Sequence, residues 1–99
     1  MINLFAISAI FFSAPSFASD MTGEQIYKTY CAGCHGAEGQ GTEMCPSFTE
    51  DKTRLKKSDE ELLLSIKNGK GMMPSFGWLF SDEDTLKVIN YLRDTFGDE

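Results

Sequence analysis

The sequence has few of the residues that most often bind metals: its 99 residues include a single histidine and only three cysteines. A closed zinc site needs four ligands, so all four of these side chains would have to meet in one tetrahedron. Cys34 and His35 are adjacent in the chain, which makes such a tetrahedron awkward. The scarcity of ligands therefore argues against zinc and asks for another explanation of these residues.

Positive charge is also scarce. Nine Lys and Arg residues stand against fifteen Asp and Glu, for a formal net charge of −6, and every charged residue follows residue 18. This balance makes the chain a poor candidate for binding nucleic acid or anionic lipid. We expect protein partners that carry a basic docking patch, although the same charges also serve simply to keep a small protein soluble. No internal repeat or second domain is evident.

The first 18 residues contain no charged side chain, and even the basic residues that usually open a signal peptide are missing. An apolar run over residues 4–12 is followed by Pro15 and by the small residues Ser16 and Ala18, a pattern typical of a signal peptide and its cleavage site. A retained membrane anchor is the alternative, but a spanning helix needs about 20 mainly apolar residues. We expect cleavage after Ala18, with residues 19–99 forming one domain that is exported to the periplasm and does not insert stably into a membrane.

Residues 31–35 form the motif C-x-x-C-H, which is typical of covalent haem attachment. On a helical turn Cys31, Cys34 and His35 share one face, because residues three and four apart are neighbours on a helix. A redox dithiol is the alternative, but it requires a βαβ context, and no strand-like alternation flanks the motif. We predict one covalently attached haem c, with Cys31 and Cys34 as thioethers and His35 as the proximal iron ligand.

The chain lacks a second histidine, which excludes bis-histidine ligation of the iron within this chain. A thioether is then the natural sixth ligand of an electron-transfer haem. Met72 and Met73 lie in a glycine-rich stretch over residues 69–77, and Pro74 favours an extended backbone at Met73. We predict Met73 as the distal ligand and Met72 as the second choice.

Three further features surround the motif. The Pro46 carbonyl, or one near it, is a candidate acceptor for the far ring nitrogen of His35, since ligating histidines nearly always have such an acceptor; otherwise Pro46 only shapes its loop. The third cysteine, Cys45, is expected to be a half-buried, unpaired thiol in a monomer, with a disulfide-linked dimer as the alternative. The basic cluster at residues 52–57 is expected to be a solvated loop, or else to contact the haem propionates or form a small docking patch.

Helix signals divide the rest of the chain into three segments. Each segment opens with a residue that favours the N-cap position, and the second opens with the capping box S-x-x-E. The last segment carries an apolar stripe at steps of three and four residues, as a helix packed on one face does. The sequence predicts an all-α fold in which three main helices wrap around the haem. The expected helices start after Thr22, Ser58 and Ser81 and end near Tyr30, Asn68 and Gly97.

From Gly23 to Phe96 these features together resemble the class I cytochrome c family, in its small bacterial monohaem form. The resemblance implies a close crossing of the first and last helices at Gly23, Tyr27 and Tyr91. It also implies a low-spin haem that passes one electron at a time between larger redox enzymes, and so an electron-transfer protein and not an enzyme. The alternative is a dedicated haem c subunit of a larger dehydrogenase or oxidase complex, because carriers and subunits share these motifs.

Overall fold

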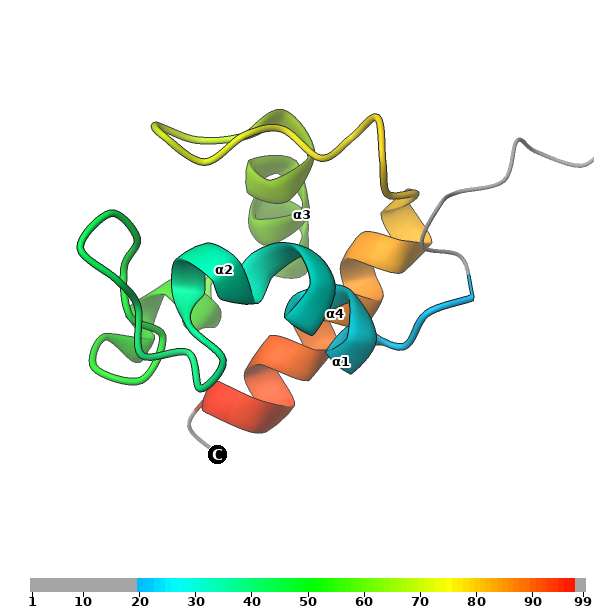
Figure 1. Ribbon diagram of the computed structural model, residues 1–99. Coiled ribbons are helices and arrows are strands. Elements are labelled where there is room, and N and C mark those ends of the chain that lie inside the picture. Colours follow the sequence, from blue (N-terminus) through cyan, green and yellow to red (C-terminus); the bar gives the residue numbers. More distant parts are fainter. Residues whose placement is uncertain (1–19, 98–99) are drawn as a thin grey trace, which may run out of the picture.

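The computed structural model describes residues 20–97, so the predicted leader at residues 1–18 lies outside the described part. The described chain is built from helices and loops (Figure 1). None of the helices between residues 20 and 97 has the length and apolar character that a membrane crossing requires. The elements are α1 (Gly23–Ile26), η2 (Tyr27–Cys31), α2 (Ala32–His35), η3 (Lys52–Lys56), α3 (Asp59–Asn68) and α4 (Asp82–Phe96).

The three main helical segments begin where the local sequence predicts. Thr22, Ser58 and Ser81 each accept a hydrogen bond from the backbone N–H three residues later, and the side chain at that later position bonds back to the cap. This reciprocal arrangement satisfies backbone donors that have no partner inside the helix. The structure confirms the predicted all-α fold with three main helices.

The first helical segment is longer than the expected end near Tyr30. It continues to His35, because α1, η2 and α2 follow one another without a break, and the middle piece is a wider π-helical turn at Tyr27–Cys31. The cysteine motif lacks the apolar period that signals a helix, so the sequence did not show this extension. As a result the C-x-x-C-H residues stand at the end of a helix that is anchored in the core.

The first and last helices cross closely, as the family resemblance implies (Figure 1). A Cβ atom built at Gly23 would lie 2.2 Å from the backbone oxygen of Lys87, so only glycine allows this approach. The rings of Tyr27 and Tyr91 meet beside the crossing with centroids 5.5 Å apart. Tyr27 is fully buried, and its hydroxyl donates a 2.6 Å hydrogen bond to the Gly36 carbonyl. The crossing thus fixes the helix that carries the cysteine motif.

The basic segment at residues 52–57 is more ordered than the solvated loop that the sequence favours. Lys52–Lys56 form the 3-10 helix η3, and Leu55 within it is buried. Arg93 of α4 donates hydrogen bonds to the carbonyls of Leu55 and Lys57, at 3.1 and 2.6 Å, and forms an ion pair with Asp59 of α3. One side chain therefore holds η3 and the start of α3 against the last helix.

Candidate functional site

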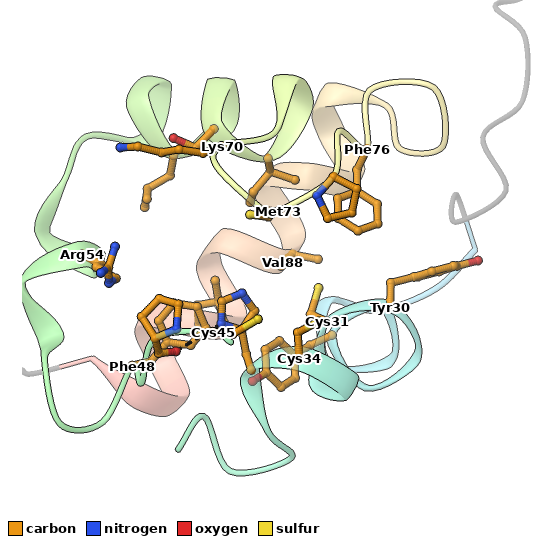
Figure 2. Close-up of a pocket in the computed structure, with 18 of the residues that line it drawn as sticks. Tyr30, Cys31, Cys34, Cys45, Phe48, Arg54, Lys70, Met73, Phe76 and Val88 are labelled. Atoms are coloured by element: carbon orange, nitrogen blue, oxygen red, sulfur yellow. Dashed lines mark hydrogen bonds between the residues drawn. The ribbon is translucent and has the colours of Figure 1, made fainter. Parts of the chain in front are cut away.

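A cavity of about 420 Å³ lies between the cysteine motif and the loop at residues 69–77 (Figure 2). Its volume falls in the range of small-molecule sites, roughly 300–1,000 Å³. Its walls are mainly apolar, because they are formed by core-facing side chains of η2, α3 and α4 and of the segment before α4. These walls suit a flat apolar group and include Tyr30, Leu62, Ile66, Phe76, Phe80 and Val88.

Cys31, Cys34 and His35 all line this cavity. Cys31 comes from the π-helical turn and packs against the core, whereas Cys34 is exposed at the cavity edge. Burial, and next the neighbouring Cys34, raise the pKa of the Cys31 thiol to about 12, so this sulfur stays protonated at neutral pH. The structure brings the three motif residues to one side of one cavity.

The His35 ring is held on two sides. Its Nδ1 lies 3.3 Å from the Pro46 carbonyl, and the Phe48 ring stacks on it with centroids 4.5 Å apart and an angle of 24°. Burial lowers the pKa of His35, the hydrogen bond to Pro46 opposes this shift, and the charge of Arg54 adds to it. A neutral ring that donates from Nδ1 to a carbonyl leaves Nε2 with a free electron pair, which is the form that binds a metal.

Met73 faces the cavity from the opposite side (Figure 2). Its side chain is half-buried, whereas that of Met72 is 75% exposed. Backbone hydrogen bonds in both directions between Lys70 and Met73, of 3.1 and 2.9 Å, hold the loop in a tight turn. The next residues are tied to the end of α3, where Phe76 N–H donates to Ile66 O at 2.9 Å. Although the two methionines are adjacent in sequence, Met73 is half-buried and faces the cavity, whereas Met72 is mostly exposed to solvent (Figure 2).

Sequence reasoning left open the role of the basic residues at this site. Arg54, Lys57 and Lys70 line the cavity, and among the described residues no Asp or Glu does. Arg54 and Lys70 lie across the cavity from the two motif cysteines (Figure 2). Lys70 was not singled out at all, since only the folded chain brings residues 54, 57 and 70 together. The Phe48 stack on His35 was likewise not expected.

Cys45 also lines the cavity and is half-buried, as the sequence predicts; that it stays unpaired with a second chain remains a prediction. Within residues 20–97, no three His, Cys, Asp or Glu side chains are grouped as a metal site would need. The donors that face each other across the cavity are the thiols of Cys31 and Cys34, the imidazole of His35 and the thioether of Met73 (Figure 2). They are set in apolar walls with cations opposite the two motif thiols, and these residues fit a covalently held haem.

Comparisons with known proteins agree with this chemistry. The family described as "Cytochrome C oxidase, cbb3-type, subunit III" matches residues 18–92. Cytochrome c6 of Picosynechococcus sp. is 32% identical over 94% of this chain and 89% of its own length. Cytochrome c6 of Gracilaria tenuistipitata var. liui is 39% identical, over 78% of this chain and 74% of its own length.

A solved structure gives the same result. The crystal structure of cytochrome c6 from the diatom Phaeodactylum tricornutum superposes with a TM-score of 0.58 at 36% identity. The superposition covers 71% of this chain and 85% of the diatom protein. The similarity in sequence and in fold therefore extends over most of this chain and over most of each cytochrome c6 described.

Proposed function

Because the chain belongs to the class I family of monohaem c-type cytochromes, which are electron-transfer proteins carrying one covalent haem c, we propose that this cavity holds the haem of a one-electron carrier. One observation supports this most strongly. One apolar cavity, which His35 also lines, has Cys31 and Cys34 on one side and Met73 on the other (Figure 2). When bound, the haem iron supplies reversible one-electron chemistry.

We assign the proximal side of the site to Cys31, Cys34 and His35. The two cysteine sulfurs would form the thioether bonds, and His35 would bind the iron through Nε2. The Pro46 carbonyl orients the ring by accepting from Nδ1, at 3.3 Å, and Phe48 packs against its face. Such an acceptor fixes both the tautomer and the angle of a ligating imidazole.

Met73 is assigned as the distal ligand. Its loop is held at its base by hydrogen bonds to the end of α3, including Gly77 N–H to Lys67 O at 3.0 Å. A loop pinned in this way would hold the Met73 thioether in one place, so that little of the chain would rearrange during electron transfer. Met72 is exposed and lies at the cavity edge, so it is the weaker candidate.

Arg54, Lys57 and Lys70 are assigned to the haem carboxylates. Arg54 and Lys70 lie on the side of the cavity away from Cys31 and Cys34, where the carboxylates of a haem attached by its vinyl edge would need positive partners (Figure 2). Hydrogen bonds between a guanidinium and a carboxylate are shorter and stronger than those between neutral groups. The basic segment at residues 52–57 would then contact the haem carboxylates, which is one of the roles that its sequence leaves open.

We further propose that the domain works outside the cytoplasm and docks briefly with redox enzymes. The family match begins at residue 18, which supports a domain starting at residue 19 after cleavage of the leader. Exposed Met44 and Met72 lie at the cavity edge and suit a small, short-lived contact. Among the described residues no acidic side chain lines the cavity, whereas the first turns of α3 and α4 each carry three acidic residues. A basic patch on a partner would therefore contact the starts of these two helices.

A role as a haem-bearing subunit of an oxidase is the second candidate. The match to the family described as subunit III of a cbb3-type cytochrome oxidase supports it. The near full-length match to cytochrome c6 favours the free carrier instead. Purification at moderate salt separates the two: a carrier elutes alone, whereas a subunit elutes with its oxidase.

Two matched substitutions test the proposed ligand set. Met73→Leu and Met72→Leu each replace a methionine by a side chain of similar volume, so both variants should fold. We expect Met73→Leu to abolish the far-red absorption band of methionine-ligated ferric haem, to lower the reduction potential, and to let the reduced protein bind carbon monoxide rapidly. Met72→Leu should leave all three properties as they are.

The opposite outcome would reject the assignment. If Met73→Leu keeps the far-red band while Met72→Leu loses it, the distal ligand is Met72. If neither variant changes the band, the sixth ligand is neither residue. Haem that is released from the unmodified protein by acidified acetone would refute covalent attachment at Cys31 and Cys34.

A further inference from the structure

Arg93 of α4 binds the segment that carries two of the basic residues of the cavity. Its Nε donates to the Leu55 carbonyl at 3.1 Å, and its Nη2 donates to the Lys57 carbonyl at 2.6 Å. Leu55 directly follows Arg54, and Lys57 itself lines the cavity, so each hydrogen bond lies at or beside a cavity cation. Arg93 does not line the cavity. Its contact with the site is therefore indirect, through the backbone at the end of η3.

The geometry of this contact suits a guanidinium. The two carbonyls lie at the end of the 3-10 helix, where backbone acceptors have no partner within the helix. A guanidinium holds its donors in one fixed plane and can meet two acceptors at once. A further donor, on Nη1, forms the ion pair with Asp59 of α3. Since Ile89 and Leu92 beside Arg93 on α4 are buried, the side chain extends from a firmly packed helix and fixes the basic segment against it.

Three cations line the cavity, and two of them come from the segment that Arg93 holds. Arg54 and Lys57 belong to this segment and Lys70 to the loop at residues 69–77, while no Asp or Glu between residues 20 and 97 lines the cavity. Arg54 and Lys70 lie across the cavity from the two motif cysteines (Figure 2). A positive charge within about 4–6 Å lowers the pKa of a carboxyl group, by about 1–3 beside an arginine. Movement of η3 would therefore change the pKa of a carboxylate bound at this end.

We propose that Arg93 is a positioning residue for the reduction potential: through the Leu55 and Lys57 carbonyls it holds Arg54 and Lys57 where they keep the haem carboxylates ionised. This inference rests on the proposed function, which places a haem in the cavity with its carboxylates beside these cations. Loss of an electron from the iron adds positive charge, which favours ionised carboxylates. When the carboxylates are already ionised in both oxidation states, electron transfer moves no proton and the potential does not depend on pH.

Without this hold the potential should depend on pH. If Arg54 and Lys57 move away from the site, the pKa of the haem carboxylates rises toward neutral pH and is higher in the reduced protein than in the oxidised one. Between these two pKa values, each oxidation sends one electron to the redox partner and one proton to water. Raising the pH then favours the oxidised form, so the potential falls. The single histidine of the chain is assigned to the iron, so no free histidine adds a pH dependence of its own.

The test uses the haem-loaded protein, whose reduction potential is measured from about pH 5 to about pH 8, above the usual pKa of a carboxyl group. We expect a constant potential for the unmodified protein and a potential that falls with rising pH for Arg93→Gln. Arg54→Gln removes one of the cations directly and should show the same fall. Lys28→Gln is the control, because it removes an exposed positive charge that does not line the cavity, and its potential should stay constant.

Two results would overturn the proposal. One is a constant potential for Arg93→Gln. The other is a constant potential for Arg54→Gln beside a falling one for Arg93→Gln, because the effect would then not pass through η3. Arg93→Lys is the second variant should Arg93→Gln fail to fold with haem. Its ammonium lacks the planar fork, so its potential should also fall with rising pH, and a constant one would contradict the proposal.

A second measurement follows the hold on η3 itself. Trypsin cleaves after the basic residues within 52–57, and cleavage of a native protein follows the fraction of molecules in which the segment is open. Loss of two half-buried hydrogen bonds should raise this cleavage rate about tenfold or more in Arg93→Gln. The rate should be unchanged in Lys28→Gln. Equal rates for Arg93→Gln and the unmodified protein would overturn the proposal.

Failure of the proposed function would look different. If acidified acetone released the haem from the unmodified protein, the haem site would be wrong and the role of Arg93 in the potential would fail with it, while trypsin would still report whether Arg93 holds η3. If every variant kept a covalent haem and the far-red band of methionine ligation but had a constant potential, only the role of Arg93 would be wrong.

Discussion

The close crossing of α1 and α4 makes Gly23→Ala a demanding test of the fold. The new methyl group would lie 2.2 Å from the Lys87 oxygen and 3.0 Å from the Tyr91 Cβ, whereas ordinary contact begins at 3.4 Å. The Lys87 oxygen belongs to a helix backbone and cannot rotate away as a side chain can. The helices must therefore separate by about 1.2 Å, the difference between 3.4 and 2.2 Å, or bend locally.

The expected cost follows from this shift. Overpacking a close contact typically costs about 1–3 kcal/mol. Alanine regains at most about 1 kcal/mol through its higher helix propensity, and less in a first turn. We expect Gly23→Ala to lower the free energy of unfolding of the haem-loaded protein by about 1–2 kcal/mol, which for a domain of this size lowers Tm by about 5–15 °C.

Thermal unfolding followed by far-UV circular dichroism measures this difference, and Gly33→Ala is the matched control. Gly33 lies on the same helical run, but a Cβ built there meets no heavy atom within 4 Å. The control should unfold at or slightly above the temperature of the unmodified protein, because alanine favours the helix. Equal Tm values for the two variants would show that the Gly23 crossing is not tight, and the argument would fail.

Two further substitutions give expected outcomes by the same assay. Tyr27→Phe removes the hydrogen bond to Gly36 and should cost about 1 kcal/mol at neutral pH. Burial also raises the pKa of Tyr27 from 10.0 to about 12. Because the unfolded chain loses the hydroxyl proton at lower pH than the folded chain does, the free energy of unfolding should fall as pH rises from about 10 to about 12. If the stability of Tyr27→Phe fell equally over this pH range, the assignment to Tyr27 would be wrong. Ser81→Ala removes the N-cap of α4 and should cost about 1 kcal/mol, with the fold unchanged; an unaffected Tm would mean that the cap at Asp84 N–H contributes little.

Much of the fold could be predicted because its signals are local. The capping residues Ser58 and Ser81 lie within four residues of the backbone groups they bond. Met73 could be favoured over Met72 because the following proline restricts the backbone of one residue only. The helical extension through Cys31 could not be predicted, because a π-helical turn breaks the period on which sequence reasoning depends.

The remaining parts of the site depend on contacts between distant segments. Arg54 and Lys70 belong to η3 and to the loop at residues 69–77, and they line the same cavity only in the folded chain. Leu55 was hidden among lysines and an arginine, and its burial follows from the hydrogen bonds that Arg93 makes to this segment. No spacing within residues 52–57 reports an interaction with residue 93.

The two sides of the cavity differ in the sequence separation between the residues that form them. This difference predicts the order in which the two sides form during folding. Pro46 follows His35 by eleven residues, and Phe48 N–H closes on Gly39 O at 2.7 Å, so the proximal half is made of short-range contacts. Met73 lies 38 residues beyond His35 and is placed only through α3. Local contacts form faster than distant ones. We expect the proximal half to form first, and the distal loop to close over it as the later, slower step of folding.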